Sequence, residues 1–201
     1  MRRVRTASVA LLLAGGTAAC GIPADDAPRS ITQEQPDDLV PEAPVTSDGQ
    51  TLVVDLYFTR FDGSRDKIVP IEREVPTGGS SSRPTPATVL EALLEGATDA
   101  DRQDHNVVSK IPDGTVLDGQ PELDGDGVLT VDLTEAIGVQ ADAARLAYGQ
   151  MVCTADELDE VAGVRFTVDD QPVQAPTGDG ATSGEPLTCE SYTNLLESPE
   201  D

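Results

Sequence analysis

Hydrophobic and polar residues alternate along several stretches of the chain, a pattern typical of strands with one buried face. In the first stretch, from Thr51 to Thr59, the predicted buried positions are Leu52, Val54, Leu56 and Phe58. The chain returns between residues 67 and 75 with Val69, Ile71 and Val75 on one face, and the turn Asp62-Gly63 predicts a hairpin. Because Pro70 has no N–H to donate, the second strand is expected at a sheet edge or to begin there.

Two other segments have helical periodicity. In the first, Thr85 can cap the free N–H groups, Pro86 suits the first helical position and Gly96 can end the helix. Its apolar stripe consists of Val89, Leu90, Leu93 and Leu94. The second helix is predicted from Asp142 to about Leu158, with a core-facing side made of Ala143, Leu146, Ala147, Met151 and either Val152 or Cys153. Gly149 weakens this helix but permits close approach to a sheet.

The remaining pattern completes one domain. Residues 115–123 and 128–133 predict a second hairpin, residues 164–168 a further strand, and residues 187–196 a terminal segment that docks through Tyr192, Leu195 and Leu196. Residues 97–110 are interpreted as a polar connection and 174–184 as a flexible loop. The order strand, strand, helix, strand, strand, helix, strand predicts a single small α+β domain of two layers, with two helices packed on a mixed sheet.

The N-terminal residues predict export and lipidation. Three arginines precede the apolar run 9–14, and the small residues Thr17-Ala18-Ala19 lead to Cys20. This arrangement is similar to the lipobox of bacterial lipoproteins, in which the cysteine is acylated and becomes the first residue of the mature protein. An ordinary signal peptide is the alternative, since Thr17 stands where the lipobox usually has Leu. The run is too short to span a bilayer.

These features divide the chain into four predicted parts. Residues 1–19 are a lipoprotein signal peptide, 20–50 a lipidated acidic tether, 51–196 the folded domain and 197–201 an acidic tail. The tether is rich in proline and acids and has no periodicity, so it cannot bury enough apolar surface to offset its chain entropy. The predicted location is the extracytoplasmic face of the cell membrane, held there by membrane lipid through Cys20.

The charge of the chain restricts its partners. It has 37 Asp and Glu against 13 Lys and Arg, a formal net charge of −24. Phosphate groups would repel such a polyanion, so nucleic acid is not an expected ligand. The oligomeric state stays open.

Catalytic chemistry has little support in the sequence. His105 is the only histidine and is interpreted as an exposed surface residue. A Cys–His nucleophile would have to combine it with Cys153 or Cys189, yet exported thiols tend to oxidise. A glycan hydrolase would need two acids flanking a cleft. An aromatic content of 3% also leaves few aromatic side chains on which sugar rings could stack. We therefore expect no enzyme, no catalytic residues and no cofactor.

One acidic turn resembles a calcium site in part. Asp124 and Asp126 match the first and third positions of an EF-hand loop, and Glu135 matches the twelfth. Val128 and Leu129, however, stand where the loop needs a ligand oxygen and a glycine. A tight hairpin turn is the favoured interpretation and no metal site is predicted, while calcium or small-ligand binding is kept as the alternative function.

The cysteines predict one disulfide. With Cys20 assigned to the lipid, Cys153 and Cys189 remain in an oxidising compartment, where they can pair and hold the terminal segment on the domain. Two buried free thiols are the alternative.

Several short motifs, taken in order, resemble the GerMN domain, the module of the sporulation and spore-germination protein GerM. They are Leu56-Tyr57-Phe58, Ile68-Val69-Pro70, the helix end at 93–98, residues 109–115 and the strand 129–133. The start Cys20-Gly21-Ile22-Pro23 is similar to the lipidated ends of actinobacterial GerMN lipoproteins of the LpqB type. The resemblance implies a non-catalytic interaction or scaffolding module with a protein partner in the cell envelope, in sporulation or in signalling.

Overall fold

The computed structural model describes residues 50–77, 83–138 and 140–198. The predicted signal peptide, the lipidated Cys20 and all of the predicted tether except Gln50 lie outside the described residues. The first strand begins at Thr51, the position where the sequence predicted the start of the domain.

The first hairpin is confirmed. Strands β1 (Thr51–Phe61) and β2 (Asp66–Pro76) pair antiparallel along their whole length. In the turn, the Asp62 carboxylate accepts hydrogen bonds from the backbone N–H groups of Arg65 and Ser64, and these bonds lower its pKa to about 2. The short strand β3 (Val107–Val108) pairs with the end of β1, so the sheet order is β2-β1-β3 and Pro70 lies in an edge strand.

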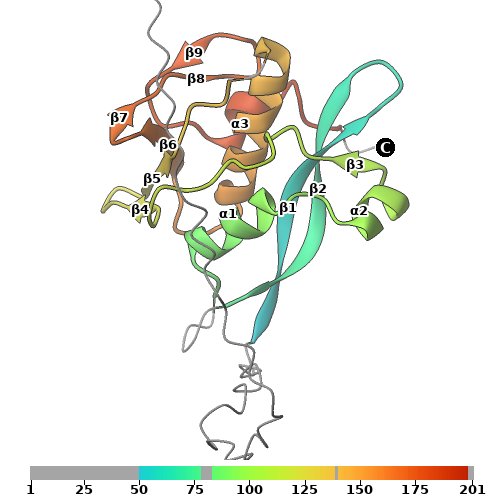
Figure 1. The fold of residues 1–201 in the computed structure, drawn as a ribbon, viewed down its shortest axis with the longest axis horizontal. Helices are drawn as coiled ribbons and strands as arrows, with labels where there is room; N and C mark the ends of the chain where they lie inside the picture. The colour runs from blue at the N-terminus through green and yellow to red at the C-terminus, as the bar shows by residue number, and fades with distance from the viewer. Residues whose placement is uncertain (1–49, 78–82, 139, 199–201) are drawn as a thin grey trace, which may run out of the picture. The chain divides into compact units, whose positions relative to one another are not determined.

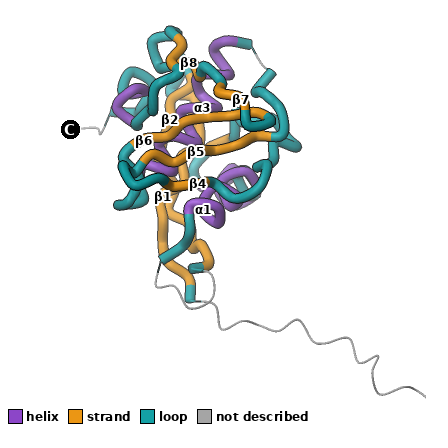
Figure 2. The backbone as a smooth tube through the Cα atoms, turned by 90° about the vertical axis from the view of Figure 1, so that its left-hand side faces the viewer, coloured by secondary structure: helices purple, strands orange, loops and turns teal. Residues whose placement is uncertain are grey.

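The remaining strands belong to separate sheets rather than to one mixed sheet. Strand β5 (Val128–Leu133) pairs antiparallel with β4 (Glu122–Leu123) and parallel with β6 (Gly163–Val168), and β6 pairs with β7 (Gln171–Pro172). Figure 2 shows β4, β5 and β6 side by side. The predicted strand 115–123 is wrong over most of its length, because only its last two residues belong to β4 and Leu117 makes a single bridge to Leu133.

Residues 174–184, which the sequence predicts as a flexible loop, include regular secondary structure. They contain a small hairpin of β8 (Ala175–Pro176) and β9 (Thr182–Ser183), in which Ala175 is buried. The buried side chain explains the order of this segment, since it gives the hairpin an anchor on the domain. The α+β class itself is confirmed, with helices packed against antiparallel and mixed sheets.

The helix α1 (Pro86–Leu94) has the predicted ends. Thr85 Oγ1 accepts a hydrogen bond of 3.2 Å from the backbone N–H of Thr88, and Gly96 has a φ of +83° just beyond the last turn. The sequence missed α2 (Asp99–Asp104), which lies in the predicted polar connection. This six-residue helix is held by reciprocal bonds between Thr98 and Asp101, so it needs no apolar stripe that periodicity could detect.

Helix α3 (Ala141–Asp156) is the centre of the fold. It connects the parallel strands β5 and β6 and contacts both β1 and β6. In Figure 1 it lies between the β1–β2 hairpin and the sheet of β5 and β6. Every residue from Leu146 to Ala155 is buried, so the helix is covered on all sides rather than on one stripe, whereas Ala143 is half-buried although it was predicted in the core.

The terminal segment docks as predicted. Tyr192, in the 3-10 helix η2 (Cys189–Tyr192), is fully buried and its hydroxyl donates a 2.8 Å hydrogen bond to the carbonyl of Pro176. The backbone of Ile68 in β2 bonds to Leu195 and Glu197, so this segment covers part of the β2 edge. Within the described part of the chain, no helix is long and apolar enough to cross a membrane.

Candidate functional site

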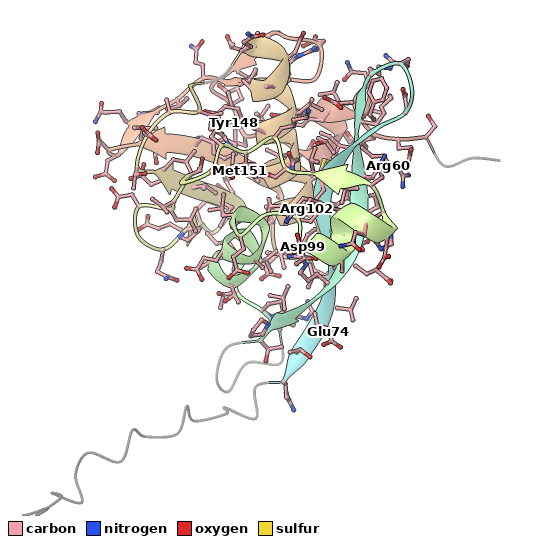
Figure 3. All side chains as sticks on the ribbon, turned by 45° about the vertical axis from the view of Figure 1, so that its right-hand side comes forward. Arg60, Glu74, Asp99, Arg102, Tyr148 and Met151 are labelled. Carbon is pink, nitrogen blue, oxygen red and sulfur yellow. A yellow bond between two sulfur atoms is a disulfide. The ribbon has the colours of Figure 1, made fainter. Side chains whose placement is uncertain are left out.

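The residues considered for catalysis do not form a nucleophilic site. Cys153 and Cys189 are joined in the predicted disulfide, 36 residues apart in sequence, so neither offers a thiolate. His105 is exposed at the C-terminal cap of α2. The exposed pair Arg102 and Asp99 on the same helix, labelled in Figure 3, is an ion pair within one turn.

The acidic turn between β4 and β5 uses its carboxylate locally. Asp124 Oδ1 accepts hydrogen bonds from the backbone N–H groups of Asp126 at 2.9 Å and Val128 at 2.8 Å, which supports the interpretation as a tight turn. Among the residues that the structure describes, no cluster of three or more His, Cys, Asp or Glu side chains could hold a metal ion.

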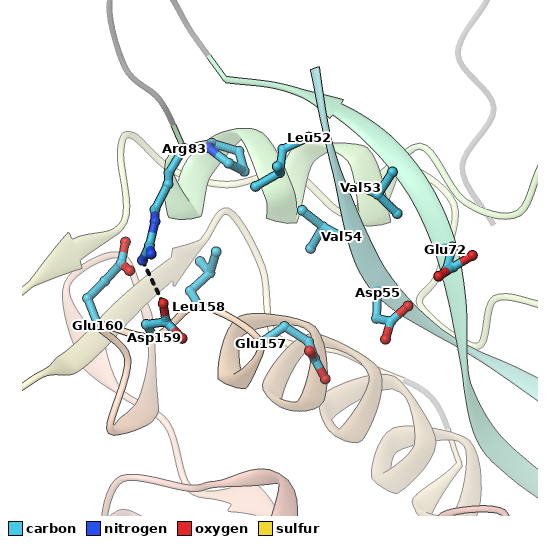
Figure 4. A pocket seen from close by; sticks show the side chains of 11 residues that line it. Leu52, Val53, Val54, Asp55, Glu72, Arg83, Glu157, Leu158, Asp159 and Glu160 are labelled. Atoms are coloured by element: carbon cyan, nitrogen blue, oxygen red, sulfur yellow. Dashed lines mark hydrogen bonds and ion pairs between the residues drawn. The ribbon is translucent and has the colours of Figure 1, made fainter. Parts of the chain in front are cut away.

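A groove of about 310 Å³ runs beside the first half of β1 and is the best candidate for a functional site. Figure 4 shows β1 along one side, the end of α3 and the loop after it on the other, and Arg83 at one end. The lining residues come from three distant parts of the sequence: Leu52, Val53, Val54, Asp55 and Glu72 from the hairpin, Arg83 and Pro84 before α1, and Glu157, Leu158, Asp159 and Glu160 after α3.

In the part of the chain that the structure describes, the wall formed by β1 is an open sheet edge. Residues in an antiparallel strand turn their N–H and C=O groups alternately toward one neighbour and the other. Gln50 accepts from the N–H of Thr77, so even-numbered residues of β1 face β2 and odd-numbered residues face away from it. The backbone groups of Val53 and Asp55 therefore point to the groove side, and among the described residues no partner pairs with them.

Further along β1, side chains of α3 close the same edge. The N–H of Tyr57 donates to Thr154 Oγ1 at 2.9 Å, and the fully buried Gln150 donates from Nε2 to the carbonyl of Tyr57 at 3.0 Å. Gln150 Oε1 also accepts from the N–H of Lys110 at 2.7 Å. Two helical side chains thus replace a neighbouring strand at Tyr57, and the groove begins where they end.

The hydroxyl of Tyr57 marks this boundary. It donates a 2.7 Å hydrogen bond to Glu157 Oε1, and burial, followed by the interaction with Glu157, raises the pKa of Tyr57. Tyr57 is therefore neutral at physiological pH and acts as a donor that fixes the Glu157 carboxylate at the rim of the groove.

The groove is acidic, and its lining also contains apolar residues. Among the described residues, its lining contains five carboxylates and one cation, and that cation, Arg83, is bound to Asp159 at 2.6 Å. Asp55 and Glu72 stand directly opposite each other in the β1–β2 register, an arrangement of like charges that destabilises a sheet. Leu52 and Val53 in the same lining are 43% and 55% exposed.

Sequence reasoning could not find this site. It assigned Leu52 to the buried face, because alternation does not show where the covering layer ends. The acids that line the groove lie up to about a hundred residues apart among 37 acids in the chain, so no local motif links them. Pro70 of β2 indicated an edge strand, but no residue of β1 did.

Comparison with known proteins identifies the family. A family model described as "Germane: Sporulation and spore germination" matches residues 55–174. This match covers more than half of the chain, and the chain belongs to this family. The segment that carries Cys189 and Tyr192 lies beyond the matched residues.

Two solved GerMN structures show the same fold at low sequence identity. The tandem GerMN domains of the sporulation protein GerM from Bacillus subtilis match with a TM-score of 0.54 and 15% identity, over 70% of this chain and 46% of that one. The first GerMN domain of the same protein matches with a TM-score of 0.50 and 14% identity, over 70% and 99% of the two chains. A putative lipoprotein from Clostridium perfringens has a TM-score of 0.43 and 19% identity, over 73% and 93%.

These matches define the extent of the likeness. The chain spans slightly less than half of the tandem GerM structure, so it corresponds to one GerMN unit. A comparison with curated protein sequences gives no significant match.

Proposed function

We propose that this protein is a lipid-anchored lipoprotein of the cell envelope whose GerMN domain binds another protein and catalyses no reaction. The observation that carries this proposal is the open β1 edge in a groove of a GerMN-type domain. An open edge is a template for strand pairing with a second chain.

Three further observations support a binding role. Cys153 and Cys189 are joined in a disulfide, the only histidine of the sequence is exposed, and the description of the matched family names sporulation and spore germination. The disulfide also fits an oxidising compartment outside the cytoplasm. The family description makes a role in sporulation or spore germination relevant, and envelope assembly and signalling are further processes in which such a binding module could act.

The anchor is tested by membrane partitioning. In a bacterial host that lipidates exported proteins, the wild-type chain should fractionate with membranes and enter the detergent-rich phase of a temperature-induced phase separation. Cys20→Ala should lose both properties, because the acyl chains supply the membrane affinity. The neighbouring replacement Ser30→Ala is the matched control and should behave as the wild type. A wild-type protein found in the aqueous phase with an N-terminus other than Cys20 would contradict the anchor.

A further inference from the structure

We infer that the groove beside β1 binds an extended peptide segment, with alternating basic and apolar residues, as an added strand on the open edge of β1. The inference rests on the proposed binding role and names the partner surface and the chemistry of its ligand.

The backbone geometry supplies the first argument. Thr51, Val53 and Asp55 direct their N–H and C=O groups away from β2, and within the described ranges these groups of Val53 and Asp55 have no partner. A peptide strand beside them would satisfy donors and acceptors on both chains, as in other cases of strand addition. The stretch ends at Tyr57, where Thr154 and Gln150 already occupy the edge.

The charges supply the second argument. Asp55 and Glu72 lie on one face of the hairpin in a cross-strand pair, and Glu157 and Glu160 line the groove next to it. An added strand places every second side chain on this face. Arg or Lys at those positions would relieve the repulsion between Asp55 and Glu72.

The opposite face of β1 determines which peptide residues should alternate with the basic ones. Leu52 and Val54 project there, with Leu158 in the same lining, so the intervening peptide side chains would meet apolar surface. The ligand that fits is therefore an alternating sequence of basic and apolar residues, rather than a run of basic residues.

Charge also selects among possible occupants. Residues 21–50 of this chain contain seven Asp and Glu and one Arg, and a second copy would bring the same five carboxylates. Both would add negative charge to an acidic groove. A basic segment of a different protein has the complementary charge.

The test measures peptide binding by the full chain in detergent solution. We would use fluorescence anisotropy with a labelled eight-residue peptide of alternating Arg and Val, a second peptide with Glu in place of Arg, and a third with the same Arg and Val residues in two blocks. The alternating basic peptide should bind at least tenfold more tightly than either of the others. Equal binding of the alternating and block peptides would show attraction by net charge alone and would overturn the inference.

Charge variants then locate the site. Asp55→Lys combined with Glu160→Lys should weaken binding of the alternating basic peptide at least tenfold. Asp104→Lys combined with Glu185→Lys makes the same change in net charge at exposed acids outside the lining and should change it less than about threefold. Equal losses in the two double variants would show that the peptide does not bind specifically in the groove. That result would overturn the inference.

Backbone variants test the added strand. Val53→Pro removes an N–H on the groove edge, whereas Glu74→Pro removes an outward N–H from the other edge of the sheet, and neither N–H belongs to the β1–β2 ladder. Only Val53→Pro should abolish binding. In the wild type, the alternating basic peptide should slow amide hydrogen exchange at Val53 and Asp55, a measurement that does not depend on the folding of any variant.

The remaining outcomes separate this inference from the proposed function. A dimer that dissociates on Val53→Pro would show that a second copy occupies the edge, and unchanged exchange at Val53 and Asp55 would overturn the strand model. Neither result affects membrane partitioning through Cys20. The lipid-anchor proposal and the peptide-binding inference can therefore be contradicted independently.

Discussion

At the scale of single residues, Gly149 shows how closely the elements approach. A Cβ atom at this position would lie 2.6 Å from Ile68 Cδ1 of β2 and 2.9 Å from Tyr192 Cδ1 of the terminal segment. The sequence predicted a close approach to a sheet, and this contact is confirmed. Tyr192, which completes it, comes from a segment more than forty residues away in sequence.

Gly149→Ala should therefore destabilise the domain. In an exposed helix this change stabilises by about 1 kcal/mol, but here the overpacking of two buried side chains should cost about 1 to 3 kcal/mol. Urea unfolding followed by circular dichroism measures the difference. Gly125→Ala is the matched control, because nothing lies within 4 Å of its added Cβ and its backbone conformation suits alanine. Unchanged or increased stability of the Gly149 variant would contradict the packing.

At the scale of elements, α2 depends on a polar junction. Asp101 bonds to Thr98 as part of the helix cap and pairs with Arg73 of β2, whose guanidinium also lies 5.4 Å from the centre of the Phe58 ring. Burial alone would raise the pKa of Asp101, but the bonds from Thr98 and the charge of Arg73 outweigh it and lower the pKa. The junction ties α2 to the sheet without an apolar helix face.

The lowered pKa fixes the pH dependence of this junction. The ionised carboxylate stabilises the folded state above the unfolded-state pKa of Asp101, and that stability is lost as the pH falls through the lower folded-state pKa. Asp101→Asn should reduce the free energy of unfolding at pH 7 by about 1 to 3 kcal/mol. The difference in the free energy of unfolding between this variant and the wild type should become smaller as the pH is lowered from 7 toward 2. Denaturant titrations at several pH values test this, with the exposed Asp104→Asn as a control, and a constant difference across that range would exclude the charge effect.

At the scale of the whole molecule, the disulfide joins the central helix to the terminal segment. Cys153 is fully buried on α3, and Cys189 opens the 3-10 helix that presents Tyr192 to the core. The bridge closes a long loop that contains β6 to β9. It therefore constrains the unfolded chain as well as the position of the terminal segment.

Reduction of this bridge should lower the free energy of unfolding by about 3 to 4 kcal/mol on the loop-closure model. Thermal melts of the oxidised protein, the reduced protein and the double variant Cys153→Ala with Cys189→Ala measure the effect. Proteolysis of the reduced form should begin in the chain after Ala175, while the β1–β2 hairpin and α1 stay protected. Uptake of two alkyl groups by the unreduced, unfolded protein would show that the bridge is absent.

The sequence determined the elements that depend on neighbours along the chain. The alternation of β1 and β2, the Asp62 turn, and the helix from Thr85 to Gly96 are local patterns whose causes act within a few residues. The resemblance to GerMN domains also came from short motifs. The Cys153–Cys189 pair followed from the even number of cysteines left in an oxidising compartment after Cys20 was assigned to the lipid.

Apart from the disulfide, the tertiary structure decided which distant residues meet. Periodicity along a strand cannot show whether β5 pairs with β1 or β6, and burial on all sides of α3 depends on two sheets that lie far apart in sequence. Within the described ranges, the first half of β1 keeps a free edge because Gln150 and Thr154 of α3 bond to this strand only at Tyr57. Packing between elements decides which edge stays open and which acids lie beside it. The local sequence around those residues does not predict either.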